Sequence, residues 1–131
     1  MITILVDHNI EGHAMLLAGA LSVEGWLDLV PLRFVTLAHA ALPYDSNDRE
    51  LWRVAQDREW ILLTANRRMQ GEGSLEQTIR EASTPTSLPV VTIGTVSRMV
   101  ESTYRARCAE RLLEILLNLE SYRGTGRLFI P

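Results

Sequence analysis

Three short apolar runs without interruption constrain the fold of this chain more than any other feature. They occupy residues 2–6, 60–64 and 90–93. A strand that is apolar at every position, and not only at alternate positions, is typical of a parallel sheet covered on both faces. The stretches between the runs carry apolar residues at helical spacing. This alternation predicts an α/β fold with three layers (α/β/α) around a central, mainly parallel sheet.

Residues that typically cap helices mark where the helices are expected to begin. Asn47 with Glu50 and Ser74 with Gln77 each have the spacing of a capping box, in which two residues satisfy each other's free backbone amides. Asn9 is predicted to cap the first helix, because asparagine is a favoured cap residue.

The last predicted helix is the longest, and its Tyr104, Cys108 and Leu112 recur at helical spacing. This stripe is expected to face the core. Residues 32–37 predict a weaker strand, and residues 128–130 a strand at the edge of the sheet.

The length of 131 residues predicts a single domain over residues 1–131. Cys108 is the only cysteine, so the sequence has neither an intrachain disulfide nor a cysteine-based zinc site. No apolar run approaches the roughly 18 residues of a membrane span, and the N-terminal residues lack the basic region of a signal peptide. We therefore expect a cytoplasmic domain without membrane contact.

The charged residues exclude several function classes. All 13 basic residues are arginine, and the net charge is −3. Without lysine the chain performs neither Schiff-base chemistry nor Walker-type phosphate binding. The same absence argues against a phosphoacceptor receiver domain, which needs a lysine after a late strand. Gly71 and Gly73 lack the third glycine of a dinucleotide-binding fingerprint.

Acidic and amide residues follow the predicted strands. Residues 7–9, 45–50 and 65–76 are expected to meet beyond the carboxyl ends of the strands, where ligands bind in parallel sheets. Asp7 is the most informative of these residues, because packing does not explain a charge directly after a buried strand. Carboxylates without thiols or paired histidines suit hard cations such as Mg²⁺ or Mn²⁺. Such a cation can activate water and stabilise charge on a phosphodiester.

Three segments resemble PIN-like ribonuclease domains. They are Val-Asp-His-Asn at residues 6–9, Asp-Arg-Glu-Leu-Trp-Arg-Val-Ala at residues 48–55, and Trp-Ile-Leu-Leu-Thr at residues 60–64. More narrowly, the chain resembles the short PIN-like domains with an Asp-x-Asn start, which are relatives of the toxin nucleases of VapBC-type toxin–antitoxin pairs. The resemblance extends from residue 3 to about residue 95. It implies a metal-dependent endonuclease for single-stranded RNA and an antitoxin-like protein partner.

The resemblance also assigns roles to individual residues. Asp7 matches the first metal-binding acid, and Asp48, or alternatively Glu50, matches the second. Many of these domains continue with Thr-x-Asp-x-Asp, whereas this chain has Thr-Ala-Asn-Arg-Arg at residues 64–68. Asn66 is therefore expected to be a neutral ligand or to orient the attacking water. The RNA substrate or its phosphates are expected to be contacted by Asn9, Arg67 and Arg68.

Structural explanations stand beside these roles. A negative charge such as that of Asp48 is favoured at the start of a helix whatever the function, and the capping box accounts for Glu50. Arg67 and Arg68 could instead neutralise the acids. Whether Glu72 or Glu76 completes the acidic cluster is left open, and a homodimer is left open too.

Two alternatives to a nuclease follow. One is a catalytically degenerate PIN-like fold that binds nucleic acid or protein. The other is an unrelated α/β protein, which would be favoured if the three polar segments lay far apart in space.

Overall fold

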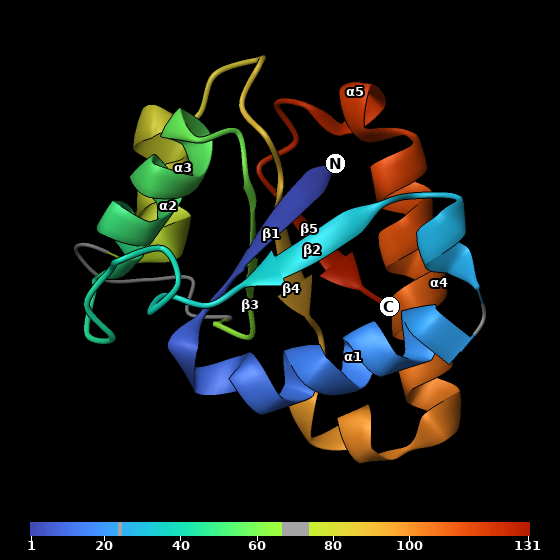
Figure 1. Cartoon of the computed structure of the whole chain (residues 1–131). Coiled ribbons are helices and arrows are strands. Elements are labelled where there is room, and N and C mark those ends of the chain that lie inside the picture. Colours follow the sequence, from blue (N-terminus) through green and yellow to red (C-terminus); the bar gives the residue numbers. More distant parts are fainter. Residues whose placement is uncertain (24, 67–73) are drawn as a thin grey trace.

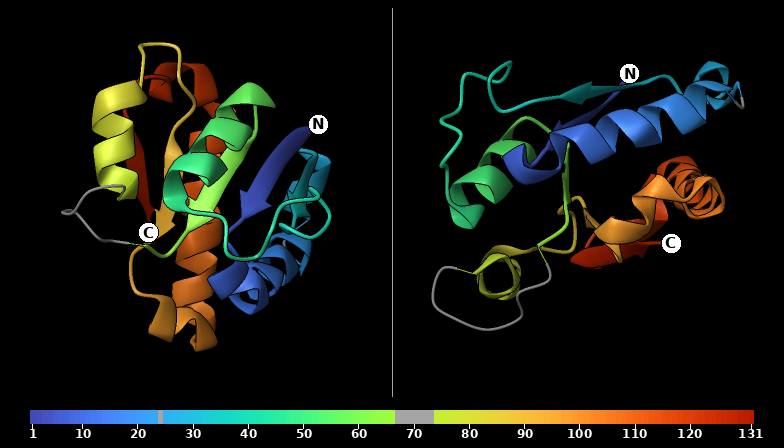
Figure 2. Two further views of the ribbon diagram at one scale, coloured as in Figure 1. Left: turned by 90° about the vertical axis from the view of Figure 1, so that its left-hand side faces the viewer. Right: turned by 90° about the horizontal axis from the view of Figure 1, so that it is seen from below.

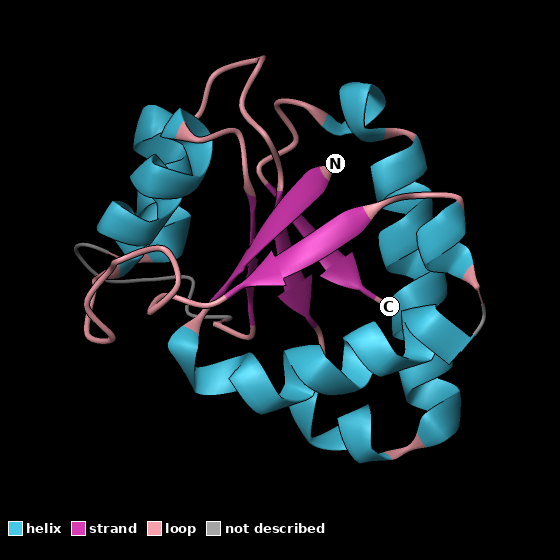
Figure 3. Ribbon diagram, viewed as in Figure 1, coloured by secondary structure: helices cyan, strands magenta, loops and turns pink. Residues whose placement is uncertain are grey.

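The computed structural model describes residues 1–23, 25–66 and 74–131, and its centre is a five-stranded parallel sheet (Figure 3). The strand order is β2-β1-β3-β4-β5, and every neighbouring pair is parallel. The expected α/β fold is thus confirmed. The strands are β1 (Ile2–Val6), β2 (Leu32–Val35), β3 (Ile61–Thr64), β4 (Val90–Ile93) and β5 (Arg127–Ile130).

The inner strands are the uninterrupted apolar runs of the sequence. All four residues of β3 and of β4 are buried, as are the last four residues of β1. The edge strands β2 and β5 are partly exposed, which explains their weaker sequence signals. The predicted edge position of the last strand is confirmed, whereas β2 ends two residues earlier than predicted.

Helices cover both faces of the sheet (Figures 1 and 2). Helices α2 (Asp48–Asp57) and α3 (Leu75–Ala82) lie on one face, over a core that contains Leu5 and Leu62. Helices α1 (Glu11–Val23) and α4 (Ser102–Leu117) lie together on the other face, over a larger core. The shorter helical segments are α5 (Leu119–Tyr122) and the 3₁₀ turns His8–Ile10, Trp26–Asp28 and Val96–Val100.

The predicted N-cap residues are confirmed at α2 and α3 but not at α1. The Asn47 side chain accepts a hydrogen bond from the Glu50 N–H at 2.9 Å, and Ser74 caps α3 in the same way. The prediction that Asn9 caps the first helix is wrong. Asn9 lies inside the 3₁₀ turn that leads into α1, and the backbone carbonyl of Asp7 accepts the first bond of that turn. The chain begins to coil directly after β1, which leaves no extended residue at position 9 to act as a cap.

The predicted core stripe of α4 is confirmed. Tyr104, Cys108 and Leu112 are all buried in the larger core. Burial raises the pKa of the Cys108 thiol to about 11, so this side chain is a neutral, apolar core group at physiological pH.

The strand order also predicts where a ligand site lies. The chain leaves β1 for β2 on one side and later returns to β3 on the other side. In this strand order the crevice beyond the carboxyl ends of β1 and β3 is the topological switch point, where α/β proteins bind ligands. None of the helices in the described part of the chain is both long enough and apolar enough to cross a membrane.

Candidate functional site

A cavity of about 470 Å³ opens at this switch point. Its walls come from all three polar segments that the sequence singled out: the residues after β1, the loop before α2 together with the start of that helix, and the residues after β3. The lining residues are Asp7, Asn9, Ile10, Tyr44, Asp45, Ser46, Asp48, Ala65 and Asn66. The segments therefore meet in space, and the alternative that depended on their separation loses its basis.

Asp7 is fixed at the end of β1. Its backbone N–H donates to the carbonyl of Leu63 at 3.0 Å, which continues the ladder between β1 and β3. Its carboxylate Oδ2 accepts a hydrogen bond from the Thr64 hydroxyl at 2.9 Å. The side chain is partly buried. A carboxylate held in this way at the wall of a cavity is oriented before any ligand arrives.

Asp48, the first residue of α2, brings a second carboxylate to the same place. It accepts hydrogen bonds from the Asn66 side-chain amide at 2.8 Å and from the backbone N–H of Leu75. Burial, followed by the negative charge of Asp7, raises the pKa of Asp48, while these hydrogen bonds and the positive charge of Arg127 counteract the rise. The two carboxylates are thus close enough to repel each other.

Asn66 connects the two acids to the rest of the fold. Its backbone N–H donates to the Thr64 hydroxyl at 3.0 Å, and its side-chain amide holds Asp48. Its carbonyl accepts a hydrogen bond from the Arg127 guanidinium at 2.7 Å. Thr64 and Asn66 together therefore orient both carboxylates from the end of one strand.

Arg127 is a buried cation next to this arrangement. Its side chain is 5% exposed and pairs with Glu76, which is 17% exposed, at 3.1 Å. The guanidinium also donates to the hydroxyl of Thr92 at 2.7 Å. One of its terminal nitrogens, Nη2, is buried and meets no hydrogen-bond acceptor among the described residues.

Sequence reasoning missed both Thr64 and Arg127 as contributors to the site. A detectable signal existed for Thr64, because it is a polar residue at the end of an apolar run. No local pattern marks Arg127, whose partners Asn66 and Glu76 are 61 and 51 residues away in the chain.

The other predicted site residues have different positions. Asn9 is exposed at the rim of the cavity. Glu50 is absent from the cavity wall, and its carboxylate accepts a hydrogen bond from the Asn47 side chain instead. The Glu76 carboxylate forms an ion pair with Arg127. The predictions for Arg67, Arg68 and Glu72 lie outside the described residues.

The donor set limits which metal ion the cavity could hold. Within residues 1–23, 25–66 and 74–131, no three His, Cys, Asp or Glu side chains gather closely enough to bind a metal. Asp7 and Asp48 nevertheless offer two carboxylates, and Asn66 has a neutral side-chain oxygen. Mg²⁺ and Mn²⁺ prefer oxygen ligands, and Mg²⁺ is commonly held by one or two carboxylates with water completing its shell. The two acids therefore fit such a cation, which would also offset their mutual repulsion.

Comparison of the chain with protein-family models, curated proteins and solved structures finds no match. Because a shared fold alone does not determine function, the assignment depends on the chemistry of this cavity.

Proposed function

We propose that the chain is a PIN-like nuclease domain that binds a divalent cation through Asp7 and Asp48 and hydrolyses single-stranded RNA. The observation that carries the proposal is the pair of carboxylates that two separate elements bring to one cavity at the switch point, where burial and then the charge of Asp7 raise the pKa of Asp48. A fold stabilised for its own sake has no need to bring two like charges together in one cavity. Like charges that are held close together and shift a pKa are common at functional sites.

The residues of the cavity have distinct parts in this reaction. Asp7 and Asp48 would hold the cation, and Thr64 and Asn66 orient them through the hydrogen bonds described above. When bound, Mg²⁺ or Mn²⁺ supplies positive charge for the phosphodiester and lowers the pKa of a bound water. Glu50, predicted as an alternative ligand, is not included in the proposed set because its carboxylate belongs to the helix cap.

The cavity rim suits an unpaired base. Tyr44 is 72% exposed, and its ring lies 5.6 Å from the ring of His8. Exposed aromatic rings bind single-stranded RNA by stacking on bases that are not paired. The net charge of −3 also argues against a general affinity for duplex backbones, which requires a positive field. The exposed ring of Tyr44 is the feature that supports single strands as the substrate.

A second candidate, the degenerate binding module, is favoured by one specific observation. The guanidinium of Arg127 lies near enough to counteract the raised pKa of Asp48. Arg127 thus supplies part of the positive charge that compensates the carboxylates. A fold that has lost its metal needs such a charge. A measurement of cation binding separates the two functions.

We expect Mn²⁺ or Mg²⁺ to raise the melting temperature of the protein by several degrees, because a ligand that binds only the folded state stabilises it. The same preparation is expected to cleave a single-stranded RNA and to leave the matching duplex intact. Thermal melting across a cation titration and gel analysis of labelled RNA test this. A melting temperature indifferent to both cations would favour the binding module.

Replacing Asn66 with aspartate is expected to tighten Mn²⁺ binding by about tenfold or more, because a third carboxylate adds charge to the site. RNA cleavage should rise with it. The matched control is Glu50→Gln, since glutamine can keep the capping box and Glu50 is outside the cavity. Calorimetric titration with Mn²⁺ measures the affinities. A loss of affinity in Glu50→Gln as large as the gain in Asn66→Asp would show that charge acts on the cation at long range and that the new carboxylate at position 66 is not a ligand.

A further inference from the structure

The loop before α2 brings an aromatic ring and a carboxylate to the switch-point cavity from neighbouring positions. Tyr44 and Asp45 are the two central residues of a turn, and both line the cavity. The backbone N–H of Ser46 closes this turn by donating to the carbonyl of Pro43 at 3.1 Å. The Ser46 hydroxyl donates to the same carbonyl at 2.6 Å. Two hydrogen bonds therefore fix the turn that carries both side chains.

The carboxylate of Asp45 differs from the other two carboxylates that line this cavity. Asp7 accepts a hydrogen bond from Thr64, and Asp48 accepts one from Asn66. Asp45 is exposed and forms no hydrogen bond or ion pair in the part of the chain that the structure describes. Within that part, Asp45 does not join Asp7 and Asp48 in a metal-binding group of three acids either. Its oxygens are thus available to another ligand in the cavity.

The chemistry of a carboxylate limits what Asp45 can bind in RNA. An ionised carboxylate accepts hydrogen bonds, donates none, and repels phosphate. Its partner is therefore a donor, either an N–H of a base or the 2′-OH of a ribose. Guanine alone among the four bases has two adjacent N–H donors on its Watson–Crick edge, at N1 and at the N2 amino group. Adenine and cytosine have an amino group beside an acceptor nitrogen, and uracil has a single N–H between two carbonyls.

We propose that Tyr44 and Asp45 form a subsite for guanine beside Asp7 and Asp48. The base stacks on the ring of Tyr44, and its N1 and N2 groups donate to the two oxygens of Asp45. Stacking gives affinity for any base, whereas the bidentate pair gives selectivity for one. The cavity of about 470 Å³ lies within the roughly 300–1,000 Å³ of small-ligand sites. The inference rests on the proposed nuclease function, because it names the base that this RNA site prefers.

The experiment measures base preference by binding alone. Nucleoside 5′-monophosphates contain no phosphodiester to cleave, and calorimetric titration with and without Mg²⁺ gives their affinities. Guanosine monophosphate is expected to bind about tenfold or more tightly than the adenosine, cytidine and uridine compounds. Inosine monophosphate keeps the N1–H but lacks the N2 amino group, so it is expected to lose most of this advantage. The 2′-deoxy form of guanosine monophosphate is expected to bind as the ribose form does.

Two variants separate stacking from base recognition. Asp45→Asn is expected to fold, because asparagine is as favourable as aspartate in turns. It should abolish the preference for guanosine monophosphate and change the other affinities little, since one of the two acceptors becomes a donor. Tyr44→Ala is expected to weaken binding of all four compounds by about fivefold or more, whereas Tyr44→Phe keeps the ring and the affinity.

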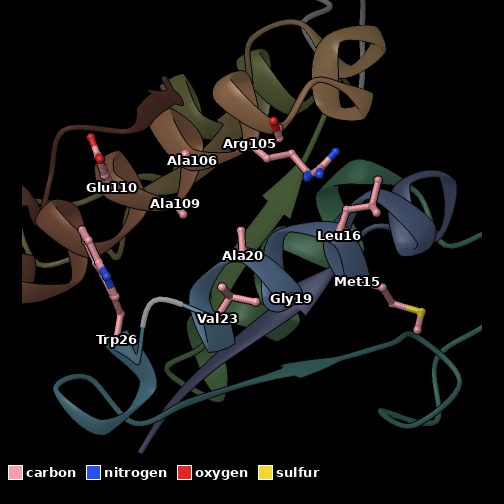
Figure 4. A pocket seen from close by; sticks show the side chains of 11 residues that line it. Met15, Leu16, Gly19, Ala20, Val23, Trp26, Arg105, Ala106, Ala109 and Glu110 are labelled. Atoms are coloured by element: carbon pink, nitrogen blue, oxygen red, sulfur yellow. The ribbon is translucent and has the colours of Figure 1, made fainter.

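The matched control is Glu110→Gln, which removes the same charge from a different cavity. Glu110 is exposed and lines the groove of about 460 Å³ between α1 and α4 (Figure 4). This groove shares no lining residue with the switch-point cavity. Glu110→Gln is therefore expected to keep the full preference for guanosine monophosphate. A loss equal to that in Asp45→Asn would show that net charge, and not a contact, sets the preference, and would overturn the subsite.

The remaining outcomes also decide the inference. Equal affinity for the four compounds, or no binding of any of them, overturns it. A preference that persists in Asp45→Asn, or one that the 2′-deoxy compound loses, overturns the contact with the guanine edge. RNA cleavage is assayed separately. Cleavage without a base preference would leave the nuclease and remove the subsite. A guanine preference in a protein that neither binds Mg²⁺ nor cleaves RNA would leave the subsite and remove the nuclease.

Discussion

Replacing Asp7 with asparagine is expected to raise the melting temperature of the cation-free protein and to abolish its response to Mn²⁺. The repulsion between Asp7 and Asp48 disappears, while the asparagine oxygen can still accept the hydrogen bond from Thr64. RNA cleavage should fall by more than about a hundredfold, because the loss of a direct ligand exceeds the usual effect of losing a group behind one. Functional sites commonly gain stability when their charges are removed.

The pH dependence of stability provides an independent check on this variant. Because the pKa of Asp48 is raised in the fold, the folded state binds more protons than the unfolded state just above the ordinary aspartate pKa of about 4. The free energy of unfolding contributed by this group therefore falls as pH rises through that window. Asp7→Asn should reduce this fall. Denaturant melts from pH 3 to pH 7, roughly the range that brackets the window, measure it. A less stable Asp7→Asn protein at neutral pH would contradict the proposed repulsion and favour the metal-free module.

Replacing Arg127 with methionine is expected to lower the free energy of unfolding by about 3–5 kcal/mol, because it leaves a mostly buried Glu76 without its counter-charge. The carbonyl of Asn66 and the hydroxyl of Thr92 also lose a donor. The double variant Arg127→Met with Glu76→Met should recover a large part of the loss, since removing both charges together avoids the uncompensated one. Urea unfolding measures all three proteins.

An exposed ion pair is the matched control for this comparison. Arg98 pairs with Glu101 at 3.2 Å, and both side chains are about half exposed. Arg98→Met is expected to lower the free energy of unfolding far less than Arg127→Met does, because water screens an exposed pair. If Arg127→Met cost no more than Arg98→Met, the buried network would not hold Asn66 in place. The orientation of Asp48 would then depend on other contacts.

Much of the fold could be predicted from the sequence because local patterns determine it. The strands β1, β3 and β4 are apolar at nearly every position, and that pattern has few explanations other than a covered parallel sheet. Asp7 and Asp48 could be predicted to lie at one edge for a similar reason. A residue directly after a buried strand, and one at the start of the helix that leads to the next strand, are brought to a common edge by the topology.

The remaining features depend on contacts that no local pattern records. The cap predicted at Asn9 is wrong because the backbone of Asp7 already closes the first turn. Glu50 is close to Asp48 in the sequence, yet its carboxylate accepts a hydrogen bond from the side-chain amide of the cap residue Asn47 and is absent from the cavity wall. Arg127 acts on Asn66 across 61 residues, and only the pairing of β4 with β5 brings it there.

The joint coverage of one sheet face by α1 and α4 has a consequence for the chain during its synthesis. The residues from β1 to β4 emerge from the ribosome before α4, so α1 and the sheet expose one apolar face until Tyr104, Leu112 and their neighbours arrive. No early intermediate can close the larger core, and a nascent chain with an uncovered sheet is prone to aggregate. Folding to the native state therefore waits for α4, and the two halves of the chain gain their stability together.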